Sequence, residues 1–124
     1  MLGLNRGNGS ACVLGGRIGV KILVTGGAGF IGSNFVRYLL HTRRDVELCN
    51  FDKLTYAGNI ENLKELDRDP RYHFVRGDIA DQPGVDEIFQ HRFNAIVHFA
   101  AETHVDRSIE DASPFLKTNI LGTH

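Results

Sequence analysis

The chain has 124 residues, of which 42% are hydrophobic, and its formal net charge at pH 7 is -1. This length fits one domain, and this hydrophobic fraction is enough for a buried core, which argues against wholesale disorder. The near-neutral charge gives no sign of the excess of basic residues that is typical of nucleic-acid-binding proteins. The sequence contains no run of about 18 apolar residues, the length needed to span a membrane. Two cysteines are too few for a disulfide framework, so we expect a cytoplasmic protein.

The first twenty residues differ in composition from the rest of the chain. They hold six of the 14 glycines and show no sustained helical or strand period. The apolar stretch from Ala11 to Leu14 is too short for the core of a secretory signal, which needs roughly 7–15 residues. We therefore expect residues 1–20 to be a disordered tail. A second hypothesis is that residues 1–19 are a mis-annotated leader, because the ordered pattern begins at Val20, which a GTG start codon would encode.

An alternation of apolar strands and amphipathic helices begins after this leader. The short β-branched run 21–25 predicts a buried parallel strand, and the glycine-rich segment 26–32 follows it. Apolar residues at spacings of three and four then predict a helix from Ile31 that ends near residues 41–44. Residues 46–51 predict a second strand. Strand, glycine turn, helix and strand together fill about 30 residues, the size of one βαβ unit.

The second half of the chain continues the alternation. Its predicted elements are a loop at 54–59, a short helix at 60–66, a strand at 72–76, a helix at 85–89 behind Pro83, and a fourth, most apolar strand at 95–101. Ser113 and Pro114 predict the start of another helix, with Ser113 as the N-cap and Pro114 in the first helical position. Strands that alternate with helices in this way predict an α/β fold with a parallel sheet.

Gly26, Gly29 and Gly32 form a G-x-x-G-x-x-G motif between the first predicted strand and the first predicted helix. The first glycine allows a sharp turn out of the sheet, the second lets a pyrophosphate approach the backbone, and the third lets the helix pack close to the strand. The helix N-terminus offers unpaired N–H groups and a positive dipole end to the phosphates. A strand before the motif and a helix after it favour dinucleotide binding over an ordinary turn.

The fold expected is a partial Rossmann-type doubly wound parallel sheet of about four strands.

Two aspartates that follow predicted strands extend this site. Asp52 lies 20 residues after Gly32, where its carboxylate can accept hydrogen bonds from the adenosine ribose and repel a 2′-phosphate. This favours NAD over NADP, and Lys53 beside it softens the preference without reversing it. Asp78 follows the third strand and either accepts a hydrogen bond from the adenine amino group or forms a turn. The residues alone leave both interpretations of Asp78 open.

Small residues at the end of the fourth predicted strand leave room for a flat ligand at the carboxyl edge of the sheet, where open α/β sheets bind ligands. Glu102, Thr103 and His104 follow directly and would face the same crevice. We expect no metal site, because His98 and His104 have no cysteine or carboxylate cluster at ligand spacing. Cys49, inside the second predicted strand, is expected to be a small core residue.

Several segments together resemble the extended short-chain dehydrogenase/reductase superfamily and, within it, the dTDP-glucose 4,6-dehydratase family of dTDP-rhamnose synthesis. They are KILVTGGAGFIGSNFVRYLL at 21–40, DKLTYAGN at 52–59, AAETHVDRSI at 100–109 and FLKTNILGT at 115–123. The resemblance covers residues 20–124. It implies that residues 21–124 are the amino-terminal part of an NAD-binding domain, and that the complete enzyme is a homodimer that takes dTDP-glucose as its substrate.

The resemblance also implies which residues contact NAD and the substrate. The implied NAD contacts are Gly26, Gly29, Phe30, Ile31 and Gly32 at the pyrophosphate, Asp52, Lys53, Leu54 and Thr55 at the adenosine ribose, Asp78 and Ile79 at the adenine, and Phe99, Ala100, Ala101 and Glu102 at the nicotinamide side. Thr118 is implied to border the cofactor as well. Thr103 is implied to touch the sugar nucleotide, and His104 to lie near it.

Members of this family remove a hydride from C4 of the glucose and return it to C6 after loss of water, which gives a 4-keto-6-deoxy sugar. The resemblance implies that this chemistry needs a Tyr-x-x-x-Lys motif and an Asp-Glu acid/base pair near a threonine. Tyr38, Tyr56 and Tyr72 have no lysine four residues further on, and the chain offers no such acid/base pair. We therefore assign no catalytic residue. We expect an incomplete copy of the enzyme, which by itself lacks dehydratase activity and shows weak or absent NAD binding.

Two alternatives remain open. The chain is also compatible with part of another nucleotide-sugar epimerase or decarboxylase, although KLTYAGN at 53–59 argues against this. A non-catalytic dinucleotide-binding or regulatory module would equally lack the tyrosine and lysine.

Overall fold

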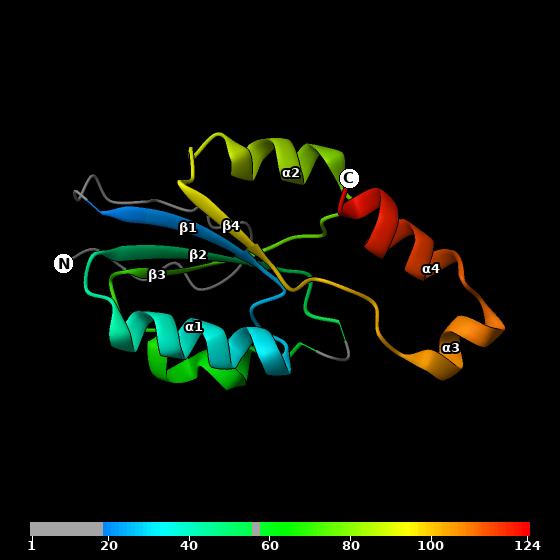
Figure 1. Ribbon diagram of the computed structural model, residues 1–124, viewed down its shortest axis with the longest axis horizontal. Coiled ribbons are helices and arrows are strands. Elements are labelled where there is room, and N and C mark those ends of the chain that lie inside the picture. Colours follow the sequence, from blue (N-terminus) through cyan, green and yellow to red (C-terminus); the bar gives the residue numbers. More distant parts are fainter. Residues whose placement is uncertain (1–18, 56–57) are drawn as a thin grey trace.

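The computed structural model describes residues 19–55 and 58–124, so the prediction for the leader falls, except for its last two residues, outside the described residues. The elements in chain order are β1 (Val20–Thr25), α1 (Phe30–Thr42), β2 (Val46–Asp52), the 3-10 helix η1 (Ile60–Leu66), β3 (Tyr72–Arg76), α2 (Gln82–Phe89), β4 (Ala95–His98), α3 (Val105–Glu110), α4 (Ser113–Phe115) and the π-helix η2 (Leu116–Gly122). In Figure 1, α4 and η2 follow one another as a single coiled ribbon at the C-terminal end.

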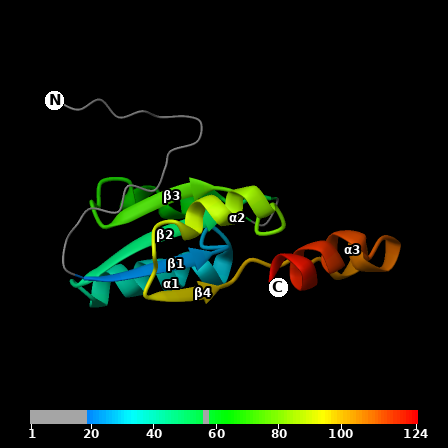
Figure 2. The same ribbon diagram turned by 90° about the horizontal axis from the view of Figure 1, so that it is seen from above.

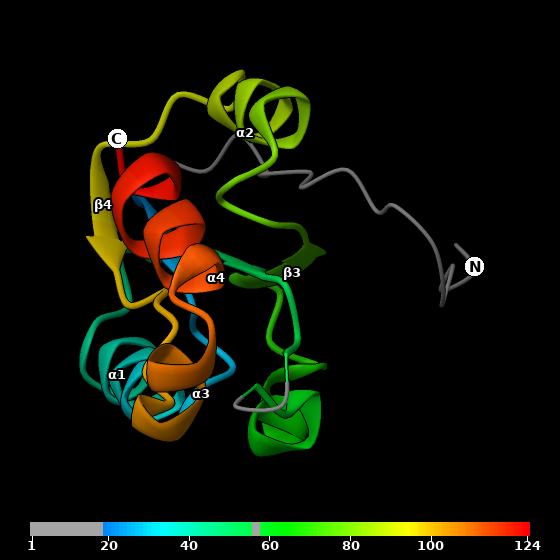
Figure 3. The ribbon, with the colours of Figure 1, turned by 90° about the vertical axis from the view of Figure 1, so that its right-hand side faces the viewer.

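The four strands form one parallel sheet in the order β3-β2-β1-β4, which Figure 2 shows from above. α1 and η1 cover one face and α2 covers the other, as Figures 1 and 3 show from two directions. This arrangement confirms the predicted Rossmann-type doubly wound α/β fold. The strand order reverses between β1 and β4, and at such a switch point the loops on either side separate and leave a crevice at the carboxyl edge.

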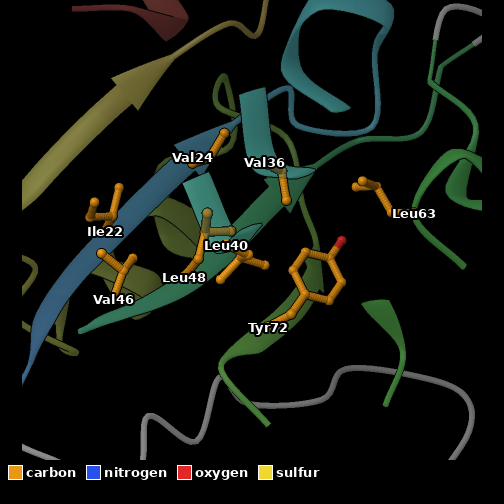
Figure 4. Packing of buried hydrophobic residues seen from close by; sticks show 8 residues of the cluster. All are labelled: Ile22, Val24, Val36, Leu40, Val46, Leu48, Leu63 and Tyr72. Carbon is orange, nitrogen blue, oxygen red and sulfur yellow. The ribbon is translucent and has the colours of Figure 1, made fainter. Parts of the chain in front are cut away.

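Two apolar clusters pack on opposite faces of the sheet. The cluster that faces α1 consists of Ile22, Val24, Val36, Leu40, Val46, Leu48, Leu63 and Tyr72 (Figure 4). The cluster that faces α2 consists of Leu23, Cys49, Phe51 and Ile88. Successive residues of β1 alternate between the two clusters because side chains along a strand point to opposite faces. Both faces of β1 and β2 are therefore covered, which explains the apolar run Ile22–Val24 in β1. The prediction that Cys49 is a core residue is confirmed.

The fourth strand is shorter and more exposed than its sequence suggests. We expected it to run from residue 95 to residue 101, but β4 ends at His98. Its partner β1 ends at Thr25, which lies opposite His98, and the chain then turns away at Gly26. Residues 99–101 consequently have no strand to pair with. Ile96 is 50% exposed because β4 lies at an edge of the described sheet.

The helices also differ from prediction at three points. α2 begins at Gln82 rather than at residue 85, because the Asp81 carboxylate caps its first turn. α3 has no counterpart among the predicted elements. The N-cap of α4 is Ala112, and the prediction that Ser113 is the cap is wrong. Ser113 is the first residue of α4 and Pro114 the second, so the prediction that Pro114 takes the first helical position is also wrong. The Ser113 N–H donates a hydrogen bond to the Asp111 carboxylate at 2.9 Å.

None of the helices within the described part of the chain combines the length and apolar character needed to cross a membrane.

Candidate functional site

A cavity of about 330 Å³ opens at the carboxyl edge of the sheet. It is lined by Gly26, Gly29, Phe30, Ile31, Gly32, Phe51, Asp52, Lys53, Thr55, Gly58, Gly77, Asp78, Ile79, Phe99, Ala100, Ala101, Glu102, Thr103 and Thr118. Every predicted site residue lies in this wall except Leu54 and His104. Sequence reasoning missed Phe51, Gly58 and Gly77, although each stands within two residues of a motif position or is part of a motif. The structure therefore brings the predicted residues together, and their binding roles remain predictions.

The three motif glycines meet different surroundings. Gly26 has a φ of +71°, and a Cβ there would lie 2.6 Å from the Cα of Ala100. A Cβ on Gly32 would overlap the carbonyl oxygen of Gly26 and lie 2.8 Å from the Cα of Gly27. A Cβ on Gly29 would come no closer than 3.4 Å to any neighbour, the carbonyl oxygen of Gly26. The fold itself thus requires the first and third glycines, whereas the second is required only if something else occupies the cavity.

The N-terminus of α1 faces this cavity without a side-chain cap. Gly29 is the N-cap residue and has no side chain, and the first turn of α1 contains no acidic residue. Phe30 and Ile31, at the start of the helix, line the cavity and are 83% and 68% exposed. The first N–H groups of a helix have no partner within the helix, so this end offers donors and a positive dipole end to an anion in the cavity.

Asp52 joins the glycine turn to the loop after β2. Its Oδ2 accepts a hydrogen bond from the Ala28 N–H at 2.8 Å, and its Oδ1 accepts one from the Leu54 N–H, also at 2.8 Å. Leu54 itself has a left-handed backbone, with a φ of 56°. Leu54 contacts Asp52 through its backbone N–H and is not among the residues that line the cavity, and its expected contact with the adenosine ribose stays a prediction. Asp52 is only 8% exposed, so its carboxylate is held in one position at the cavity wall.

Asp78 is engaged through both of its carboxylate oxygens. Oδ1 accepts a hydrogen bond from the Ala80 N–H at 2.9 Å, so Asp78 does form a turn. Oδ2 lies 2.7 Å from the Nζ of Lys53. Burial raises the pKa of the Asp78 carboxyl, but the bonds from Lys53 and Ala80 outweigh this effect and hold the pKa below its usual range. The adenine contact remains a prediction.

A buried polar chain beneath the glycine turn escaped the sequence analysis. The Asn50 side chain accepts a hydrogen bond from the Gly27 N–H at 3.0 Å and donates one to the Tyr72 Oη at 3.0 Å. Burial raises the pKa of Tyr72 to about 12, so the phenol is neutral and accepts this bond at neutral pH. The available signal was a polar residue, Asn50, between the apolar residues Cys49 and Phe51 of a predicted strand.

The opposite wall of the cavity is the loop that follows β4. The Asn119 side chain accepts a hydrogen bond from the Glu102 N–H at 2.8 Å and donates one to the Glu102 carbonyl at 2.9 Å. η2, which carries Asn119, also supplies the lining residue Thr118. His104 is the N-cap residue of α3 and is not part of the lining, and its expected position near the sugar nucleotide stays a prediction. Asn119 therefore ties the loop and the last helix together at this wall.

We expect Asn119→Ala to loosen this wall while the sheet stays folded. Two exposed hydrogen bonds are lost, so the free energy of unfolding should fall by about 1 kcal/mol. Amide hydrogen exchange in residues 99–103 should accelerate, whereas exchange in β1 and β2 should not change. Asn119→Asp keeps the acceptor for the Glu102 N–H and should give an intermediate effect. Unchanged exchange of the loop amides in Asn119→Ala would contradict this role.

No group of three or more histidine, cysteine, aspartate or glutamate side chains in residues 19–55 and 58–124 is placed to hold a metal ion.

Comparison with known proteins identifies relatives that match most of the chain. The model of the GDP-mannose 4,6 dehydratase family matches residues 23–124. A dTDP-glucose 4,6-dehydratase of Neisseria meningitidis serogroup B is 56% identical over 104 residues, which are 83% of this chain and 29% of that protein. The chain thus spans less than a third of the length of this curated relative.

Solved structures with a similar fold include both a dehydratase and an epimerase. The crystal structure of a dTDP-glucose 4,6-dehydratase from Streptomyces venezuelae, with NAD and TYD bound, has a TM-score of 0.78 and 53% identity over 84% of this chain and 33% of that one. A UDP-Glc/GlcNAc 4-epimerase from Campylobacter jejuni has a TM-score of 0.76 and 36% identity over 85% of this chain and 31% of that one.

Proposed function

The chain belongs to the GDP-mannose 4,6-dehydratase family, and from this premise we propose that its cavity binds NAD and that it supplies the NAD-binding part of a dTDP-glucose 4,6-dehydratase. The observation that carries the proposal is the open space at Gly29 beside the uncapped N-terminus of α1. The Neisseria relative, at 56% identity, is named as such a dehydratase, and the Streptomyces structure contains NAD.

The residues present fit this cofactor. A Cβ at Gly29 would fill space beside the helix N-terminus that the protein itself leaves open, as a pyrophosphate site requires. The charged residues of the lining are Asp52, Lys53, Asp78 and Glu102, so side chains contribute more negative than positive charge. Pyrophosphate binding must therefore rely on backbone N–H groups and the helix dipole.

Each part of the wall then has a proposed task. The α1 N-terminus holds the pyrophosphate, Asp52 accepts hydrogen bonds from the adenosine ribose, and the loop after β4 borders the nicotinamide. NAD, when bound, supplies a hydride acceptor and donor to this edge of the sheet. Thr103 lines the same end of the cavity and is proposed to contact the nucleotide sugar.

The identity of the substrate rests on the relatives. Relatives named dTDP-glucose 4,6-dehydratase reach 56% identity, and the Campylobacter epimerase reaches 36%. This difference favours dTDP-glucose over the substrate of an epimerase, although both proteins share the fold. We propose on the family resemblance alone that the whole enzyme is a cytoplasmic homodimer.

Gly29→Ala tests the proposal. The added methyl meets nothing in the protein closer than 3.4 Å, so the chain should fold normally. The methyl occupies space proposed for the pyrophosphate, so NAD affinity should fall by about tenfold or more, a loss of about 1.4 kcal/mol. We would follow amide signals during titration with NAD by ¹H–¹⁵N NMR, which detects weak binding.

The matched control is Gly84→Ala in α2, outside the cavity lining. Its methyl would meet only the Asp81 carboxylate, which can move. This variant should bind NAD as the parent chain does. Equal NAD affinity in Gly29→Ala and Gly84→Ala would contradict the proposed pyrophosphate site, and no signal changes in the parent chain would contradict NAD binding.

A further inference from the structure

Lys53 is the one cationic side chain among the described residues that line the cavity. It directly follows Asp52, whose carboxylate is fixed by two backbone N–H groups at the proposed ribose position. NADP differs from NAD by a phosphate on this ribose. An ammonium group on a flexible stem is a phosphate-binding group, so a Lys53 side chain free to reach this ribose would favour NADP.

In the structure this ammonium group forms an ion pair with Asp78. Its Nζ lies 2.7 Å from the Oδ2 of Asp78, which reaches it from the loop after β3. Asp78 is itself fixed, because its Oδ1 accepts the Ala80 N–H, and its lowered pKa keeps it ionised at neutral pH. Arg76, which lies opposite Asp52 on β3, and Lys117, whose charge acts on Asp78, both lie outside the lining.

We propose that Asp78 is a specificity-determining residue, which favours NAD over NADP by holding the Lys53 ammonium away from the position of a 2′-phosphate. Asp52 repels the extra phosphate directly, and Asp78 removes the cation that would compensate for that repulsion. The inference rests on the proposed function, because it concerns the selectivity of the same cavity.

Asp78→Asn separates the two roles of this residue. The amide oxygen of asparagine can still accept the Ala80 N–H and preserve the turn, but the charge that holds Lys53 is gone. If an adenine contact is also weakened, NAD and NADP lose affinity equally, so the informative quantity is the ratio of their dissociation constants. We expect the preference for NAD to narrow by about tenfold at low salt, the effect of about one charge-assisted hydrogen bond.

The experiment titrates the 124-residue chain and its variants with NAD and with NADP by ¹H–¹⁵N NMR at low ionic strength. Lys53→Met in the Asp78→Asn background should cancel the gain in NADP affinity, because no cation remains to be released. Asp67→Asn removes one negative charge from an exposed site outside the lining and should leave the ratio unchanged.

The outcomes separate this inference from the proposed function. If the parent chain binds neither nucleotide, the proposed function fails and the inference fails with it. If the parent chain binds NAD but Asp78→Asn keeps the parental ratio, the inference alone is overturned. A narrowed ratio that persists in the double variant would also overturn it, since the effect would then not pass through Lys53.

Discussion

Gly32→Ala is expected to abolish or severely reduce folding. The new methyl would overlap the carbonyl oxygen of Gly26 and lie 2.8 Å from the Cα of Gly27, and both obstacles are backbone atoms. Relief would require α1 to move away from β1, which would disturb the cluster around Val24 and Val36. We expect the free energy of unfolding to fall by about 3 kcal/mol or more, a large part of the stability of a small domain.

Denaturant unfolding followed by circular dichroism would measure this loss. Gly29→Ala is a stringent control, since it makes the same chemical change three residues earlier in the same motif, where the methyl has room. The structure predicts that Gly32→Ala loses stability and that Gly29→Ala retains it. A shared unfolding midpoint for the two variants would show that helix–strand packing does not depend on the third glycine.

Asn50→Ala is expected to have the second largest effect on stability. The substitution leaves the Gly27 N–H without its acceptor and the Tyr72 phenol without its donor, and Asn50 is fully buried. Buried polar groups that lose their partners cost roughly 1–3 kcal/mol each, and the smaller side chain also leaves a cavity. We expect the free energy of unfolding to fall by roughly 2–4 kcal/mol.

The comparison variant is Tyr72→Phe, which removes the phenol oxygen but keeps the ring in the core. Asn50 then still accepts the Gly27 N–H, so this variant should lose less stability than Asn50→Ala. Both variants would be unfolded with denaturant at neutral pH. If Tyr72→Phe proved as destabilised as Asn50→Ala, the bond to the glycine turn would not be the important one.

The cavity wall was largely predictable because its residues sit in local patterns. The glycine motif and Asp78 follow strands and Asp52 ends one, and parallel strands bring their carboxyl ends to one edge of the sheet. Once the alternation of strands and helices was recognised, residues more than 50 positions apart were expected at one place. Leu54 and His104 lie in the same motifs but outside the cavity lining, because position in a motif does not tell which way a side chain points.

Contacts between separate loops were not accessible in this way. No periodicity shows that Asn119 reaches Glu102, that Asn50 supports Gly27, or that Asp78 holds Lys53. Likewise, the apolar sequence after Val97 suggested a longer fourth strand, and only the end of β1 at Thr25 shows why it stops. Strand and helix formation follows local spacing and backbone preference. Where a strand ends, and which side chains pair, depends on distances between segments. These distances are set only once the sheet has formed. The same holds for the pairing of the Lys53 ammonium group with Asp78 in the cavity wall.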